Sequence, residues 1–344
     1  MINLVLTSDQ RTRYSRMLAL PNVDEQAMKS ILDTHVTVVG AGGLGSPILR
    51  LLTAIGFGTI RVIDHDIVDL SNLQRQTIYN TDDIGTPKAE TAVSNLAPMN
   101  PDVVFEPYSV TIREDNASDL LGGTDIILDG LDSIKARRAV NRASQELHIP
   151  YVYAGAIQHY ANISTFIPGE TGCLHCLLGD TQDTSEMTCE NVGVTPTILS
   201  LAASIEVQEA IMISTQKEPS LANHLLHMDI NQLSFDRFAI HRNEDCPVCS
   251  KKLSKEPAEE DDFMVTILCT GSFSISPPTR RKIDFNAVAK KLPAAYKSVV
   301  TEAFLKIIKD DGITITLLPK GNAVVEGVTS AKQALHDYKQ ILDV

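Results

Sequence analysis

The sequence predicts an α/β protein: a Rossmann-like, mostly parallel sheet with an antiparallel extension, followed by a small C-terminal α+β module. Between residues 36 and 156, short β-branched runs alternate with helix-like stretches, which is typical of βαβ units. Stricter alternation of apolar and polar residues at 161–167 and 224–241 indicates antiparallel strands. A charged stretch without apolar periodicity, residues 250–262, then separates these patterns from a second set.

The first set of elements begins with an N-terminal helical arm, expected over residues 1–35. The strand runs that follow are HVTVVG, TIRVID, DVVFEPYSV, TDIILDG and YVYAGA. They are nearly continuously apolar, as expected when helices cover both faces of a parallel sheet. A long helix is predicted at about 196–215, between the antiparallel strands.

The second set of elements, after the charged stretch, predicts a compact module. Nothing in its sequence indicates a function for it. We expect strand MVTIL, a helix near 285–309, strand ITITLL, turn PKGN, strand AVVEG and a helix near 330–342. The chain is therefore divided into a first domain at 1–250, a linker at 251–262 and a C-terminal domain at 263–344.

Composition and charge exclude some classes of function. The 344 residues include 30 Lys and Arg against 43 Asp and Glu, a net charge of −13. Duplex binding relies on clustered Lys and Arg, so no nucleic-acid partner is expected. The N-terminal residues lack a secretory signal pattern, and no apolar run approaches the roughly 18 residues that span a bilayer. We expect a cytoplasmic protein without a membrane partner.

A glycine-rich turn, Gly40-Ala41-Gly42-Gly43-Leu44-Gly45, follows the first predicted strand and opens a helix. Its glycines allow the backbone to approach a phosphate at the helix N-terminus. Asp64 comes 19 residues after Gly45 at the end of TIRVID, where an acid can hydrogen-bond a ribose hydroxyl. These residues predict an adenine nucleotide but do not separate NAD from ATP. The alternative is a turn that only connects strand to helix.

Charged residues further along favour ATP. Nucleotidyl transfer places negative charge on phosphate oxygens and on leaving pyrophosphate, which fixed cations such as Arg75 and Lys88 stabilise. Asp132 follows a strand at the carboxyl edge of the sheet, where it can hold Mg²⁺. A single Arg or Lys is more often a solvated surface charge, and Asp129 is explained by capping the next turn. The joint order of these residues supports the functional interpretation.

Four of the six cysteines form two Cys-x-x-Cys pairs, Cys173 with Cys176 and Cys246 with Cys249. Two such pairs predict a closed, structural Zn²⁺ site with four thiolates and no open position for chemistry. A redox role usually involves a single pair beside a helix N-terminus. Buried pairs without a metal are the third interpretation.

In combination, these motifs make residues 10–250 resemble the MoeB/ThiF family. Members are adenylyltransferases that activate ubiquitin-like sulfur carriers and are related to ubiquitin-activating enzymes. The resemblance rests on RYSRM, GAGGLG, VIDHDIVDLSNLQRQ, GTPK, LDGLD, GCLHC, TCENVGV and CPVC. It implies an ATP–Mg²⁺ site whose principal residues are Gly43, Asp64, Ser71, Asn72, Arg75, Lys88 and Asp132. The other glycines of the turn, Gly40, Gly42 and Gly45, and Ser133 are implied to belong to the same site.

The resemblance has further implications for single residues. Arg16 resembles an arginine that the family contributes to the active site of the other subunit, which implies a homodimer. Ser133 stands where the family usually has Asn, so altered contact with the nucleotide is expected there. Cys189 matches a loop cysteine that forms a thioester or persulfide-linked intermediate in some members, and a spare thiol is equally compatible. Cys269, outside the resemblance, is expected to be a small core residue of a strand.

The implied reaction joins ATP to the C-terminal glycine carboxylate of a ubiquitin-like carrier that ends in Gly-Gly, releasing pyrophosphate. No general base is needed, because a carboxylate is ionised near neutral pH. Residues 157–245 are expected to present a groove for the tail of the carrier. Sulfur transfer would need an external sulfur donor, since nothing here resembles a rhodanese domain. The alternatives are activation of another peptide or small-molecule carboxylate, an NAD-dependent oxidoreductase, which Arg75 and Lys88 disfavour, and a non-catalytic scaffold.

Overall fold

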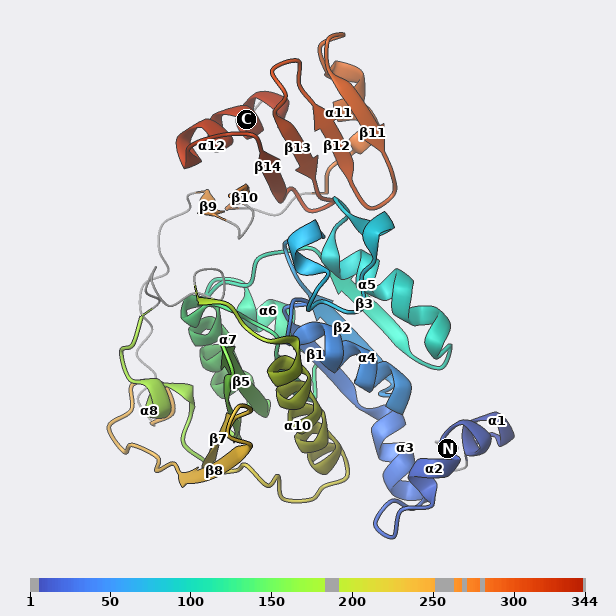
Figure 1. Ribbon diagram of the computed structural model, residues 1–344, viewed down its shortest axis with the longest axis vertical. Helices are drawn as coiled ribbons and strands as arrows, with labels where there is room; N and C mark the ends of the chain where they lie inside the picture. Colours follow the sequence, from blue (N-terminus) through green and yellow to red (C-terminus); the bar gives the residue numbers. More distant parts are fainter. Residues whose placement is uncertain (1–5, 183–191, 251–262, 268–270, 279–281, 343–344) are drawn as a thin grey trace.

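A computed structural model describes residues 6–182, 192–250, 263–267, 271–278 and 282–342. The described residues form two sheets, with helices packed against both (Figure 1). The larger sheet has eight strands in the order β3-β2-β1-β4-β5-β6-β7-β8. The smaller has six strands in the order β11-β12-β13-β14-β10-β9. The mostly parallel α/β architecture is therefore as predicted.

The helices before the linker are α1 (Ser8–Arg13), α2 (Ser15–Leu18), α3 (Glu25–Asp33), α4 (Gly45–Ile55), α5 (Lys88–Leu96), α6 (Ala117–Leu121), α7 (Ile134–Leu147), α8 (Leu174–Leu178) and α10 (Pro196–Ser214). Short 3₁₀ helices are η1 (Leu70–Asn72), η2 (Thr81–Asp83) and η3 (Ala97–Met99). The strands of the larger sheet are β1 (His35–Val39), β2 (Thr59–Ile63), β3 (Val104–Tyr108), β4 (Ile126–Asp129), β5 (Tyr151–Ile157), β6 (Tyr160–Phe166), β7 (His224–Asp229) and β8 (Ser234–Ala239).

Strand β1 lies at the centre of the parallel part of the sheet. It pairs in parallel with β2 on one side and β4 on the other, so the strand order reverses at β1. In open α/β sheets, ligands bind at the carboxyl ends of the strands where the order reverses. Strands β6 to β8 continue the sheet in antiparallel pairs, as the alternating pattern predicted.

Helices cover both faces of the larger sheet because β1 is apolar on both. Val36 and Val38 point to the face covered by α4, α5 and α10, where the larger core lies. Val39 points to the opposite face, into a second core formed with α6 and α7. Strand β3 contains Pro107, which is tolerated because β3 is an edge strand.

Helix α10 is the one described helix that is long and apolar enough to cross a membrane by length and composition. The expectation that no stretch approaches this length was therefore wrong. The helix packs against α4, β5 and β6 instead, and Ile198, Ala202 and Val207 lie in the core. It also carries two buried carboxyl groups, Glu206 and Glu209. These contacts make α10 a central core helix of the fold.

The C-terminal elements are β9 (Met264–Ile267), β10 (Phe273–Ser276), α11 (Phe285–Lys291), β11 (Lys297–Val300), β12 (Leu305–Ile308), β13 (Thr314–Leu317), β14 (Ala323–Glu326) and α12 (Ala331–Leu342). The predicted helix at 285–309 is wrong beyond Lys291. Pro293 cannot continue a helix, and the β-branched residues after it pair as a hairpin of β11 and β12. The predicted linker at 251–262 lies outside the described residues.

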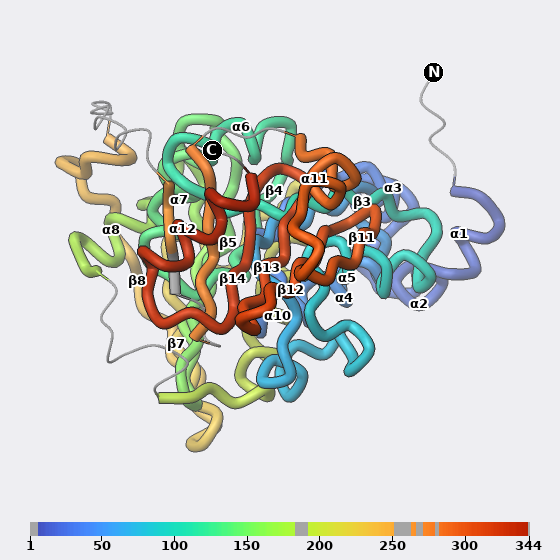
Figure 2. Tube along the Cα trace, turned by 90° about the horizontal axis from the view of Figure 1, so that it is seen from above, coloured from blue at the N-terminus to red at the C-terminus, as the bar shows by residue number. Residues whose placement is uncertain are grey.

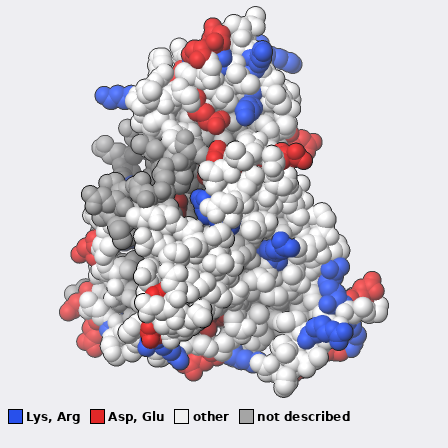
Figure 3. Space-filling model, viewed as in Figure 1, with Lys and Arg blue, Asp and Glu red and all other residues white. Residues whose placement is uncertain are grey.

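The two ends of the larger sheet have different neighbours (Figures 1 and 2). The C-terminal elements lie above the carboxyl ends of the parallel strands, beside the loops that follow β2 and β3. The helical arm, α1 to α3, lies at the other end, where β1 begins. In Figure 3, basic side chains gather over this arm, which exposes Arg11, Arg13 and Arg16.

Candidate active site and metal centre

The glycine-rich turn brings the ends of β1 and β4 unusually close together. Gly40 has φ +95°, and a Cβ there would lie 2.4 Å from the carbonyl oxygen of Gly130. A Cβ at Gly45 would lie 1.9 Å from the carbonyl oxygen of Gly40. Only glycine fits both positions. The turn therefore places the N-terminus of α4, with its free N–H groups, at the point where the strand order reverses.

Residues from the segment after η1 and from α10 line this helix N-terminus. Gly43 faces Arg75, whose Cδ would lie 3.6 Å from an added Cβ, and also faces Leu199 of α10. Gly42 faces the buried amide of Gln76, whose nitrogen would lie 3.7 Å from a Cβ added at Gly42. The guanidinium of Arg75 donates to the carbonyl oxygen of Ser71 at 2.9 Å. Arg75 is thus beside the turn, and its predicted contact with phosphate stays a prediction.

Asp64 holds the turn in place. Its carboxylate accepts from the backbone N–H of Ala41 at 2.7 Å and from that of Asp66 at 2.8 Å. This contact fixes the N–H of Ala41 against the end of β2. The predicted contact of Asp64 with a ribose stays a prediction.

Lys88 is buried at the start of α5 and pairs with Asp66, whose Oδ2 lies 2.7 Å from its Nζ. Burial alone would lower the pKa of Lys88, but Asp66 and Asp64 outweigh it and raise this pKa, and Asp132 acts in the same direction. The ammonium is therefore charged at neutral pH. The buried hydroxyl of Tyr79 donates toward the carbonyl oxygens of Ala41 and Lys88, at 3.0 and 3.2 Å, and so links the turn to α5.

Asp132 is exposed at the carboxyl end of β4, on a loop that two buried residues hold. Asp129 accepts from the N–H of Leu131 at 2.8 Å, so the predicted capping role of Asp129 is confirmed. Arg137 donates to the carbonyl oxygen of Leu131 at 2.6 Å and to Asp129 at 3.0 Å. Both peptide groups of Leu131 are thus fixed, and with them the position of Asp132.

The remaining predicted residues have local roles. Ser133 is the N-cap of α7, where its hydroxyl accepts from the N–H of Ala136 at 3.1 Å. Asn72 is buried and caps η1 together with Asp69, to which the Ser71 hydroxyl also donates at 2.6 Å. Arg16 lies on α2, at the opposite end of the sheet from the turn (Figure 1).

Both remaining cysteines, Cys189 and Cys269, lie outside the described residues, so their predicted roles stay predictions.

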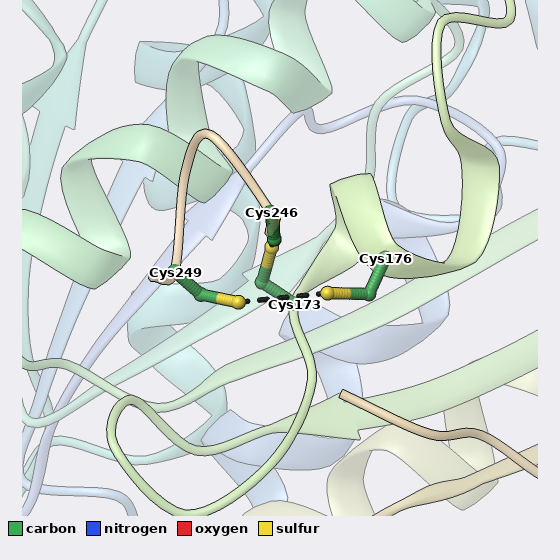
Figure 4. A group of neighbouring side chains, drawn as sticks. All are labelled: Cys173, Cys176, Cys246 and Cys249. Carbon is green, nitrogen blue, oxygen red and sulfur yellow. Dashed lines mark hydrogen bonds between the residues drawn. The ribbon is translucent and has the colours of Figure 1, made fainter. Parts of the chain in front are cut away.

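The four paired cysteines come together as predicted (Figure 4). Their sulfur atoms all lie within 4.8 Å of one another, with Cys173 and Cys246 at 3.7 Å and Cys176 and Cys249 at 3.5 Å. A tetrahedral ion with Zn–S bonds of 2.3 Å separates its ligands by about 3.8 Å, so the spacing fits Zn²⁺. Burial raises the pKa of the Cys173 thiol to about 11, a cost that a bound cation offsets.

This centre links segments that are distant in the sequence. Cys173 is the N-cap of α8, after β6, and Cys246 and Cys249 follow β8. A metal ion here joins both segments at the antiparallel end of the sheet, away from the glycine-rich turn.

Sequence reasoning missed several residues around the turn, namely Asp66, Gln76, Tyr79 and Arg137. The position of Asp66, two residues after Asp64 at a strand end, was a usable signal for a second carboxylate in the site. Tyr79 and Gln76 gave none, because each acts through a contact with the turn, Tyr79 with Ala41 and Gln76 with Gly42, more than 30 residues away in the sequence.

Comparison with known proteins settles the family. The pattern of the ThiF family matches residues 14–248. This chain belongs to the ThiF family. A relative from Haloferax volcanii, "SAMP-activating enzyme E1", is 33% identical over 73% of this ThiF-family chain and 93% of its own. The "Sulfur carrier protein ThiS adenylyltransferase" of Bacillus subtilis is 28% identical and matches 95% of this chain and 98% of its own, so the match includes the C-terminal module.

Solved structures support the same fold. The crystal structure of Escherichia coli MccB with ATP has a TM-score of 0.62 at 21% identity, covering 69% of the ThiF-family chain and 74% of MccB. The MccB structure with succinimide gives a TM-score of 0.64 over 72% and 75%. At this identity the likeness concerns the fold.

Proposed function

We propose that this chain is an adenylyltransferase that uses ATP to activate the C-terminal glycine carboxylate of a ubiquitin-like sulfur-carrier protein. The observation that carries the proposal is the convergence of Arg75, Lys88 and Asp132 around a glycine-rich turn where the strand order reverses. Relatives named as adenylyltransferases of sulfur carriers support the carrier as substrate. An NAD-dependent oxidoreductase has no use for these cations.

The arrangement suits displacement at the α-phosphate of ATP. The N–H groups of α4 are available to the phosphates, with Asp64 toward the ribose. The carrier carboxylate attacks the α-phosphorus, and the bond from phosphorus to the pyrophosphate oxygen breaks. Arg75 and Lys88 stabilise the negative charge that develops on the phosphate oxygens and on pyrophosphate. To bind the phosphates, the ammonium of Lys88 must give up part of its contact with Asp66.

Two metal ions complete the proposal. Asp132 would hold Mg²⁺, which supplies neutralisation of phosphate charge when bound. The four cysteines would hold a structural Zn²⁺, which supplies stability and no open coordination position.

The finer expectations belong to the same proposal. The chain acts in the cytoplasm as a homodimer in which Arg16 reaches the site of the partner. Cys189 is available for a covalent carrier intermediate, and sulfur comes from an external donor. Residues 1–250 form the catalytic domain, 251–262 the linker and 263–344 an added domain.

Exchange of labelled pyrophosphate into ATP tests the proposal. We expect exchange to require Mg²⁺ and a small protein that ends in Gly-Gly. The matched control is the same carrier without its last two residues, which should support no exchange. Exchange that proceeds equally without the carrier, or only with a small-molecule carboxylate, would contradict the assignment.

A further inference from the structure

The C-terminal module contacts the loop after β2, which carries the ion-pair partner of Lys88. Val324 of β14 is fully buried and packs against Ile67, which is 5% exposed, in an apolar contact between the module and the first domain. Ile67 immediately follows Asp66, the ion-pair partner of Lys88. The module therefore lies beside the loop after β2 that carries Asp66 (Figure 1).

Ile67 is at the centre of a short pair of antiparallel segments, 66–68 and 85–88, which we call the Lys88 ladder. Ile67 bridges Pro87. The N–H of Lys88 donates to the carbonyl oxygen of Asp66 at 2.9 Å, and the N–H of Val68 donates to that of Thr86 at 2.8 Å. Because these bonds place the first residue of α5 directly opposite Asp66, they fix the backbone of Lys88 relative to the end of β2.

Polar contacts surround the apolar one. The Nζ of Lys306 on β12 lies near Gly85 of the ladder, 3.0 Å from where a Cβ would be. Burial raises the pKa of Glu326 on β14, and the carboxylates of Asp69 and Asp66 add to this effect. The module thus presents an apolar residue and charged groups of both signs to the same loop.

A second set of contacts fixes the module to the loop after β3. The hydroxyls of Thr111 and Ser276 are 2.6 Å apart, and the amide of Asn322 donates to the Thr111 hydroxyl at 3.5 Å. The ammonium of Lys320 lies 3.9 Å from the centre of the Tyr108 ring. Because these contacts act on a different loop, Val324 is held in position independently of Ile67.

We propose that the C-terminal module is a positioning element of the nucleotide site. Val324 supports Ile67, Ile67 holds the Lys88 ladder, and the ladder places the ammonium of Lys88 for the phosphates of ATP. This inference rests on the proposed function. Small displacements of a phosphate-binding group slow catalysis, so a contact that fixes the position of Lys88 affects the reaction. Val324 and Ile67 are positioning residues, since neither contacts the nucleotide itself.

Adjacent residues of β14 provide a matched pair of variants. Val324 and Val325 are both fully buried, and neighbouring residues of a strand point to opposite faces. Val325 packs in the core of the module, whereas Val324 packs against Ile67. Val324→Ala and Val325→Ala therefore remove the same atoms from equally buried positions, but only Val324→Ala removes support from the ladder.

The full-length variants are compared by pyrophosphate exchange and by hydrogen exchange of backbone amides. For Val324→Ala we expect the KM for ATP to rise about threefold or more, with the KM for the carrier unchanged. The amides of Val68 and Lys88 should also lose protection. Val325→Ala should keep both properties while lowering the melting temperature by a similar amount. The double variant Ile67→Val with Val324→Ile, which conserves the volume of the contact, should restore the KM for ATP.

An unchanged KM for ATP and unchanged amide protection in Val324→Ala would overturn the inference, as would equal effects of Val325→Ala. Failure of the proposed function is separate from this result. It would be seen as absence of carrier-dependent exchange in the wild-type protein, and the hydrogen-exchange comparison would still decide whether Val324 supports the ladder.

Discussion

Asp132 is the single residue on which the proposed chemistry depends most directly. It is exposed beside the turn. Its loop is held by Asp129 and Arg137, and Asp132 itself does not hold the loop. Removing its carboxylate therefore leaves the loop intact and removes the proposed Mg²⁺ ligand. We expect Asp132→Ala to lower pyrophosphate exchange by about 100-fold or more without changing the melting temperature. Asp119→Ala, which removes an exposed carboxylate on α6, is the control, and exchange near the wild-type rate in Asp132→Ala would remove Asp132 from the site.

Glu206 gives the protein a predictable dependence on pH. It is fully buried on α10, where burial, and then Asp129, raise its pKa well above the usual range. The folded state therefore holds a proton that the unfolded chain releases above its ordinary pKa of about 4.3. Stability from this group is complete below that pH and is lost as the pH rises toward the folded pKa.

Glu206→Gln should remove this dependence, because an amide needs no proton to stay neutral. Relative to wild type, the variant should gain up to about 1.4 kcal/mol of unfolding free energy per pH unit above pH 5. Urea unfolding of both proteins at pH 5 and pH 8 measures the difference. The same difference at the two pH values would show that Glu206 is ionised in the folded protein.

At the scale of elements, the cysteine pairs predict a stabilising metal. We expect about one zinc per chain by elemental analysis. Chelation, or Cys173→Ser, should lower the free energy of unfolding by about 4 kcal/mol, because the cysteines then lose the metal ion that joins them. Cys269→Ser, which leaves both pairs intact, is the control. Protein that is purified without zinc and is equally stable would contradict a metal role.

The elements that the sequence predicted well are those with local signals. The glycine-rich turn, the parallel strands and the cysteine pairs each have a spacing that follows from backbone geometry. The helix predicted to 309 failed because apolar spacing alone does not separate a short helix followed by a hairpin from a longer helix. The pairing of Lys88 with Asp66 depends on the Lys88 ladder, in which two separate segments meet. The support from Val324 depends on a contact between residues more than 250 positions apart. Neither feature therefore had a local signal in the sequence.

At the scale of the whole molecule, the position of α2 bears on assembly. Arg16 is exposed on a helix at the end of the sheet opposite the turn, so it does not reach the site of its own chain. A catalytic role for Arg16 therefore requires a second chain. Arg16→Ala and Asp132→Ala should each be inactive alone.

Co-expression of the two variants with different tags tests this arrangement. In a dimer of one Arg16→Ala chain and one Asp132→Ala chain, one of the two sites has both residues. The isolated mixed dimer should therefore recover about half of the wild-type activity. A mixed dimer without activity would show that Arg16 does not act across an interface.

The central claim is that the chain transfers the adenylyl group of ATP to the C-terminus of a carrier. Intact-mass analysis of a carrier captured with the enzyme, ATP and Mg²⁺ tests this claim most directly. The account predicts a carrier that is heavier by one adenylyl group, with the group on the terminal glycine and pyrophosphate as the only other product. A carrier of unchanged mass, or formation of ADP and phosphate in place of pyrophosphate, would contradict it.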